Sequence, residues 1–128
     1  MEYSQAIGRV QDTVVKLRYL ECMDNLLYCD RWNVCPPGGF SYQTSVGAYL
    51  AELRHDQLDN SRVRELVEHF ASFSSEDYAS DLDRGMVRYL TERYQEAVQI
   101  PAELLAQLNR ANAEGQQAWE ECFQNDDF

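Results

Sequence analysis

The sequence predicts an all-α fold, a bundle of about five helices with a long first helix. Apolar residues recur at steps of three and four along most of the 128 residues, the spacing that places them on one face of a helix. No stretch alternates apolar and polar residues for long enough to indicate a half-buried strand. The composition, 45% hydrophobic and 26% charged, is typical of a globular protein, and we expect residues 1–128 to form a single helical domain.

The first predicted helix covers about residues 3–32 and carries two apolar rows on adjacent faces. A helix with two such rows is expected to pack against partners on two sides. It ends at the run Cys35-Pro36-Pro37-Gly38-Gly39, because proline disfavours helical geometry in the residue before it and the glycines permit sharp turning. The first row is Ile7, Val10, Val14, Leu17, Leu20 and Leu27, and the second is Val15, Tyr19, Cys22, Leu26 and Cys29.

Four further helices follow, each marked by the residues that begin it. Ser61 is suited to cap the third helix. The pair Ser74-Ser75, followed by two acidic residues, predicts the start of the fourth helix, and Pro101 at the first helical position predicts the start of the last. The expected ranges are 41–58, 61–73, 75–98 and 101–124, with an acidic tail after them.

The charge balance argues against several classes of partner. The chain has 11 Lys and Arg residues against 22 Asp and Glu residues, so its formal net charge is −11 and it repels nucleic acid and anionic membrane surfaces. No apolar stretch approaches the ~20 residues needed to cross a bilayer, and no basic segment leads into an apolar one at the N-terminus. We therefore expect a cytoplasmic protein with no nucleic-acid and no membrane partner.

The four cysteines are expected to be free and mostly buried thiols. Cys22 and Cys29 are separated by about 10.5 Å of helical rise, which exceeds the ~7 Å limit for a disulfide. A disulfide between Cys29 and Cys35 stays geometrically open. Neither these residues nor Cys122 form the close Cys-x-x-Cys pair that is typical of structural zinc sites.

Few residues are candidates for chemistry. His55 and Asp59 lie one helical turn apart and are weak candidates for a metal site, but their setting favours a solvated polar helix face. His69 is expected at the boundary of an amphipathic helix. Cys35 is the candidate nucleophile of a thiol enzyme, although nothing in the sequence pairs it with a histidine base. We therefore predict no catalytic residue, no metal site and no cofactor for this chain.

Several short motifs occur in order along the chain. They are Cys29-Asp30-Arg31-Trp32-Asn33-Val34-Cys35-Pro36-Pro37-Gly38-Gly39, then Tyr49-Leu50-Ala51-Glu52-Leu53-Arg54-His55-Asp56, Ile100-Pro101-Ala102-Glu103-Leu104, Ala118-Trp119 and Asp127-Phe128. Together they resemble the N-terminal region of the carboxypeptidase Taq family of zinc metallocarboxypeptidases. That family has a Trp-Asp-Gln motif before Met-Pro-Pro-Gly-Gly, and later Leu-Ala-x-Leu-x-His-Glu and Ile-Pro-x-Glu-Leu. The matching positions include Asp30, Pro36, Pro37, Gly38, Gly39, His55, Ile100, Pro101 and Trp119.

The chain also departs from the family pattern. The family's Trp, Gln and Met correspond to Cys29, Arg31 and Cys35, and Gln43 stands where an Arg is expected. The family's zinc site, a His-Glu-x-x-His helix with a distant Glu, lies beyond the matched region. The resemblance therefore implies no metal ligand and no catalytic Glu at any position here. It does imply helices that cap one wall of a substrate cleft and help to frame a homodimer.

The resulting hypothesis is a non-catalytic helical domain related to these enzymes, with a peptide-binding or assembly role. An exposed apolar patch would favour a homodimer. Two alternatives stay open. One is a small metal-binding or thiol enzyme that uses His55 and Asp59 or Cys35, and the other is a regulatory protein that binds an intact, full-length metallopeptidase of the family.

Overall fold

The computed structural model describes residues 1–127, and within them the all-α prediction is confirmed: there are five α-helices, two short 3-10 turns and no strand. The first helix is long, as predicted. In chain order the elements are α1 (Tyr3–Asn33), η1 (Pro37–Gly39), α2 (Phe40–Leu58), α3 (Ser61–Phe70), η2 (Ser75–Asp77), α4 (Asp81–Gln99) and α5 (Ala102–Asn125).

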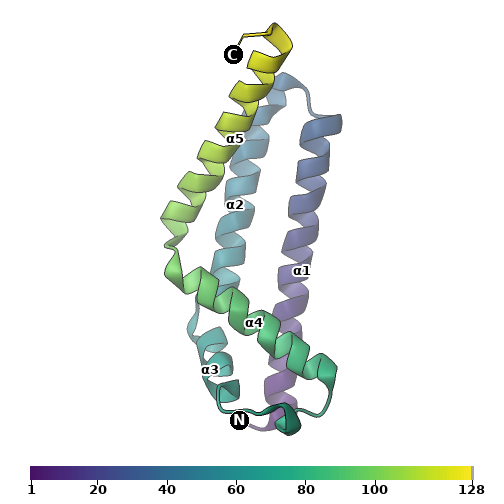
Figure 1. The fold of residues 1–128 in the computed structure, drawn as a ribbon, viewed down its shortest axis with the longest axis vertical. Helices are drawn as coiled ribbons and strands as arrows, with labels where there is room; N and C mark the ends of the chain where they lie inside the picture. Colours follow the sequence, from purple (N-terminus) through teal and green to yellow (C-terminus); the bar gives the residue numbers. More distant parts are fainter. Residues whose placement is uncertain (128) are drawn as a thin grey trace.

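Three of the helices form one elongated layer. The chain ascends α1, returns along α2 and ascends again along α5, so that α2 lies between the other two helices (Figure 1). α2 packs against both α1 and α5, while α4 packs across α1 and α3. The short helix α3 lies at the end of the molecule that holds the N-terminus (Figure 1).

The hydrophobic core occupies only this end of the molecule. It is built where the first half of α1 meets α3, α4 and the last turn of α2. At the other end, where α1, α2 and α5 meet, the buried apolar residues among those described are only Ala48 and Ala51, and α5 has no buried residue. The core members are Ala6, Ile7, Val10, Leu17, Leu58, Val63, Leu66, Phe70, Val87 and Leu90.

The accessible surface is large for a chain of this mass. It amounts to 8778 Å², whereas a compact monomer of 14.9 kDa is expected to expose about 7,000 Å². The excess arises because the layer formed by α1, α2 and α5 has no second layer against it among the described residues. A substantial part of the apolar side chains in this layer is consequently left in contact with solvent.

α1 packs against both α2 and α4, but its second apolar row is exposed, which corrects the prediction that this row faces a partner within the chain. Val15 is 44%, Tyr19 62% and Leu26 65% exposed, and no other helix in the described part of the chain covers them. Cys22 and Cys29 in the same row are exposed free thiols, and Cys35 and Cys122 are only partly buried. The prediction of free thiols agrees with the structure, but the prediction that they are mostly buried is wrong.

Three helix starts differ from the prediction, either in the capping residue or in the residue at which the helix begins. Asn60, not Ser61, caps α3: its Oδ1 accepts a hydrogen bond from the backbone N–H of Val63 at 3.0 Å. Ser74 begins only the short turn η2, and α4 begins six residues later, with Ser80 as its cap. Pro101 occupies the capping position of α5 rather than its first helical position.

The turn η2 is closed by a reciprocal cap. The backbone N–H and the hydroxyl of Ser74 both donate to the carboxylate of Asp77, at 2.6 and 2.8 Å. These two hydrogen bonds lower the pKa of Asp77, since they favour its charged form. Ser74-Ser75 is therefore a capping sequence, as predicted, but the element that it begins is the short turn η2 and not the long helix α4.

Tyr3 ties the start of α1 to the start of α4. Its hydroxyl donates to Asp83 Oδ2 at 2.8 Å and accepts from the backbone N–H of Ala79 at 2.9 Å. Its ring stacks on Phe73 and meets Phe70 edge-on. Burial raises the pKa of Tyr3, and in the same way the pKa values of Tyr78 and Tyr89. The folded chain therefore holds these protons to a higher pH than the unfolded chain does.

We expect Tyr3→Phe to lower the stability by about 1 kcal/mol at neutral pH, because two hydrogen bonds are lost. A raised folded-state pKa contributes stability that is complete below the unfolded value of about 10 and is lost as the pH rises above it. The variant should accordingly lose less stability than the parent between about pH 8 and 11. Thermal unfolding across this range measures both effects. Tyr28→Phe, at an exposed site outside the core, is the control, and an unchanged alkaline slope in Tyr3→Phe would contradict the argument.

Candidate functional site

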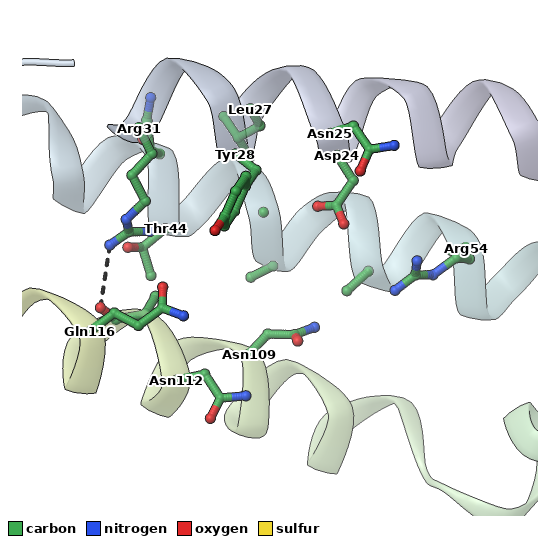
Figure 2. A pocket seen from close by; sticks show the side chains of 15 residues that line it. Asp24, Asn25, Leu27, Tyr28, Arg31, Thr44, Arg54, Asn109, Asn112 and Gln116 are labelled. Carbon is green, nitrogen blue, oxygen red and sulfur yellow. Dashed lines mark hydrogen bonds between the residues drawn. The ribbon is translucent and has the colours of Figure 1, made fainter. Parts of the chain in front are cut away.

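A polar groove of about 280 Å³ lies between α1, α2 and α5 (Figure 2). Its floor is formed by Gly47, Ala48 and Ala51 of α2. These residues are small, so α1 and α5 stand as walls on either side of a trough rather than closing over it. Figure 2 shows Tyr28 and Arg31 of α1 extending toward α5 across the groove.

Many of the polar side chains around the groove make no polar contact within the described part of the chain. Carboxamides are especially frequent, and three of them, Asn109, Asn112 and Gln116, come from one face of α5. Among residues 1–127, no hydrogen bond or ion pair joins these side chains to another residue. The same holds for Asn25, Tyr28 and Arg54.

Arg31 bridges the two walls at one end of the groove. Its Nη2 donates to the backbone carbonyl of Ala113 on α5 at 3.3 Å, the contact drawn as a dashed line in Figure 2. Its guanidinium also lies 5.4 Å from the centre of the Phe40 ring, within reach of a cation–π contact. Arg31 is thus already engaged, whereas Arg54 near the other end is not.

Gln43 lies in the wall of the groove and is 5% exposed. Its amide Nε2 donates a short hydrogen bond to the carboxylate of Asp30. Its Oε1 is buried and accepts no hydrogen bond. Gln43, which departs from the family pattern, therefore contacts Asp30, which matches it. One acceptor atom of the Gln43 side chain is left without a donor.

His55 is buried, which corrects the prediction of a solvated helix face. It is 7% exposed, and its Nε2 lies 3.1 Å from the carbonyl oxygen of Ile100. The corner between α4 and α5 folds over this side of α2, a contact across 45 residues that helical spacing does not reveal. Asp59 Oδ2 is 4.0 Å from His55 Nε2. Two of the motif residues, His55 and Ile100, are thus brought together in a structural contact.

The residues described do not fit a zinc ion. A catalytic zinc takes three protein ligands, and no group of three or more His, Cys, Asp or Glu residues between 1 and 127 is arranged to hold a metal. His55 and Asp59 are only a pair. His69 packs against the rings of Phe70 and Phe73 at the core end, and its Nε2 is buried without a partner. The two histidines thus serve separate contacts.

The Pro-Pro-Gly-Gly segment forms η1 between α1 and α2. Pro36 precedes the turn, Pro37 is its first residue, and the thiol of Cys35 contacts the carbonyl oxygen of Pro36 at 3.4 Å. A Cβ on Gly39 would lie 2.7 Å from Cys35 Sγ, so a larger residue at position 39 would require the thiol of Cys35 to move. No described glycine has a positive φ, so left-handed backbone does not account for this glycine. The thiol of Cys35 thus fills the space left by Gly39.

Trp119 lies apart from the other motif residues. It is 59% exposed on α5 and stacks on Phe123, with ring centres 5.5 Å apart. Asp30 and Gln43, by contrast, are joined by a hydrogen bond between α1 and α2, and of the two only Gln43 lines the groove. The motif residues therefore divide between the groove, the α4–α5 corner and the exposed side of α5, and they do not converge on one reaction centre.

The fold and the groove define an all-α protein with a polar groove between three of its helices. The chain belongs to the Carboxypeptidase Taq (M32) metallopeptidase family, which matches residues 9–128. It is similar to Thermostable carboxypeptidase 1 of Thermus thermophilus, with 30% identity over 111 residues. That match covers 86% of this chain and 22% of the length of the relative.

No solved structure matches the chain. The helices of residues 1–127 include none that is both long and apolar enough to cross a membrane. The family membership confirms the resemblance carried by the ordered motifs. Since the chain spans about a fifth of its relative, the activity, substrates and partners of that protein belong to the proposal below.

Proposed function

We propose that this chain is a non-catalytic helical unit of the Carboxypeptidase Taq (M32) family and acts by docking to another polypeptide, first of all a second copy of itself. The observation that carries the proposal is the exposed apolar face along α1 and α2. We call it the docking face, and it comprises the exposed residues Val15, Tyr19, Met23 and Leu26 of α1 and Tyr42 and Tyr49 of α2, with the partly buried Val46 and Leu53 of α2 between them.

The docking face lies beside the seam between α1 and α2, on the side away from α5. The seam itself is formed by partly buried leucines, and Leu27 approaches within 3.6 Å of the position that a Cβ on Gly47 would take. Met23 lies one helical turn from Leu20 and Leu27, and Val46 and Leu53 lie three residues beyond the α1-facing Gln43 and Leu50. The apolar side chains of the two helices therefore adjoin.

The composition and extent of this face suit a protein interface. Aromatic residues and methionine are enriched in interfaces, whereas charged residues are depleted from their centres. The whole chain exposes about 1,800 Å² more than a compact monomer of its mass, and a standard interface covers ~800 Å² on each partner. A two-fold dimer would cover the same face on both copies. Because each copy carries a formal charge of −11, added salt should strengthen the association.

The absence of a three-ligand group among the described residues supports the non-catalytic part of the proposal. The four free thiols support a reducing compartment, and we place the protein in the cytoplasm. Binding of a peptide is a second role for the same unit and is favoured by the polar groove rather than by the docking face.

The test uses one zinc-supplemented sample of the full chain. Bound metal, carboxypeptidase turnover and mass by light scattering are measured together. We expect no stoichiometric zinc, no turnover and twice the mass of one chain. Tightly bound zinc with turnover would overturn the non-catalytic assignment. A monomer that associates only with an intact member of the family would instead support a regulatory role and overturn self-association.

A further inference from the structure

We propose that the outer face of α5 docks a basic amphipathic helix of a partner protein. The outer face is the apolar stripe on the side of α5 turned away from α2, and it consists of Leu104, Leu108, Ala111, Gly115 and Trp119. None of these residues lines the groove, and none belongs to the docking face. The inference therefore goes beyond self-association, because it assigns a second surface to a partner of a different chemistry.

The apolar side of α5 points toward solvent. Within the described residues α5 packs against α2, at the edge of the layer (Figure 1). The positions of α5 that are partly buried include the small or polar residues Ala106, Asn109, Ala113, Gln117 and Glu120. The stripe on the opposite side is more apolar, yet Leu104 is 46%, Leu108 47% and Trp119 59% exposed. An amphipathic helix normally buries its apolar side, so this stripe is left open to a partner.

A hollow floored by small residues lies in the middle of the outer face. Its volume is about 320 Å³, and its lining is Ala111, Asn112, Gly115, Gln116 and Trp119. A Cβ on Gly115 would meet no atom within 4 Å beyond its own part of the helix, so packing inside the described chain does not require a glycine there. Glycine weakens a helix relative to alanine, whereas it allows a second backbone to approach closely. The hollow therefore favours a helix that lies directly against α5.

The length of the outer face sets the length of the partner helix. Leu104 and Trp119 are fifteen residues apart, so the stripe extends for about 22 Å. A partner helix of about four turns, or ~15 residues, covers this distance.

The charge of α5 selects a basic partner. Between residues 111 and 127 there are five acidic residues and no Lys or Arg. Glu114 and Glu121 lie about two helical turns apart on one flank of the outer face. No carboxylate of α5 forms an ion pair with a residue of the described chain. Lys or Arg residues beside the apolar stripe of a partner helix therefore meet carboxylates that are not yet neutralised, whereas acidic residues there would be repelled.

The experiment titrates the isotope-labelled full chain with acetyl-(Lys-Leu-Ala-Lys-Lys-Leu-Ala)2-amide, a basic peptide whose leucines share one helical face. The chain has two tryptophans, Trp32 on α1 and Trp119 on α5, so their two indole N–H signals in the NMR spectrum distinguish the two surfaces. We expect a saturable shift of the Trp119 signal and an unchanged Trp32 signal. The absence of a saturable Trp119 shift would overturn the proposal.

Two further peptides separate helix docking from simple charge attraction. One has Glu in place of every Lys, and the other has the composition of the basic peptide with its leucines spread around the helix. Each should bind at least about tenfold more weakly than the basic peptide. Equal binding of the two basic peptides would overturn the proposal, because net charge alone would then account for the association.

Substitutions in α5 test the hollow and its acidic flank. Gly115→Leu fills the hollow and should weaken binding at least about tenfold, while the free chain keeps its stability because the new side chain extends into open space. Gly85→Leu is the matched control, since Gly85 also has open space around it but lies in α4. Glu114→Gln combined with Glu121→Gln should weaken binding about fivefold, whereas Glu65→Gln, at an exposed position of α3, should not. Equal affinity of Gly115→Leu and Gly85→Leu would overturn the proposal.

Two readouts distinguish this inference from self-association. Added salt should weaken binding of the basic peptide, because opposite charges attract, whereas it should strengthen self-association. Leu26→Glu, in the docking face, should bind the peptide as the parent does, and loss of the Trp119 shift in this variant would overturn the assignment to α5. If Gly115→Leu alone halved the mass of the protein by light scattering, a second copy would cover the outer face, and the proposed partner would be wrong.

Discussion

Leu26→Glu is expected to convert the self-associated protein into a monomer without unfolding it. Leu26 is 65% exposed within one chain and lies in the docking face, so its substitution removes little from the interior of the monomer. In a dimer the new carboxylate would be buried against apolar groups without a partner, at a cost of several kcal/mol. We expect the dissociation constant to rise at least about 100-fold. Light scattering or sedimentation over a range of concentrations measures the change.

Two controls make this result specific to the docking face. Gln107→Glu introduces the same charge at an exposed position on α5 and should leave the association unchanged. The thiols of Cys22 and Cys29, which are exposed in the single chain, should react slowly with a maleimide in the parent and quickly in Leu26→Glu. If the variant keeps the mass of the parent, the chain associates through another face.

Local sequence patterns predict where the helices form but not which parts of the chain pack against them. Helical spacing correctly predicts the long α1 and the helical content, since hydrophobic periodicity and caps act over a few residues. The same spacing identifies Val15, Tyr19 and Leu26 as an apolar row, yet the pattern does not determine whether another part of the chain covers it. In the structure the row is exposed, so an apolar row at helical spacing does not by itself identify a face that is buried in the core.

The groove illustrates a second limit of local reasoning. Its residues come from α1, α2 and α5, and Asn25 and Asn112, which face the same groove, are far apart in the sequence. Isolated asparagines carry no periodic signal, because exposed polar residues are common on any helix. The departure at Gln43 is visible in the sequence, whereas its contact with Asp30 and its unpaired oxygen require the fold.

The burial of His55 also depends on a contact between residues that are far apart in the sequence. His55 and Asp59 have the spacing of a solvated face, and the corner between α4 and α5 covers His55 while Asp59 stays exposed. A break at Pro101 is predictable from the sequence, but the direction that the chain takes after it depends on packing across α2. Contacts at long range therefore decide whether a titratable residue is a candidate for chemistry or a structural hydrogen-bonding group.

Leu90→Ala is expected to have the largest effect on stability, a loss of about 3 kcal/mol. Leu90 is 1% exposed in α4, within the core that α1, α3 and α4 share, so truncation leaves a cavity among residues that cannot all move to fill it. A loss of this size is a large part of the ~5–15 kcal/mol typical of a domain. It should be measured by denaturant unfolding in the Leu26→Glu background, because association would otherwise add to the apparent stability.

The matched control is Leu82→Ala in the same helix, which should change stability by less than about 0.5 kcal/mol because Leu82 is 69% exposed. Hydrogen exchange gives the complementary result. In the monomeric variant the amides of α5, which has no buried residue, should exchange faster than those in the buried part of α4. If Leu90→Ala and Leu82→Ala were equally stable, the core around Leu90 would not be the main source of stability. The stability would then have to come from the layer of α1, α2 and α5, although many apolar residues of that layer are exposed.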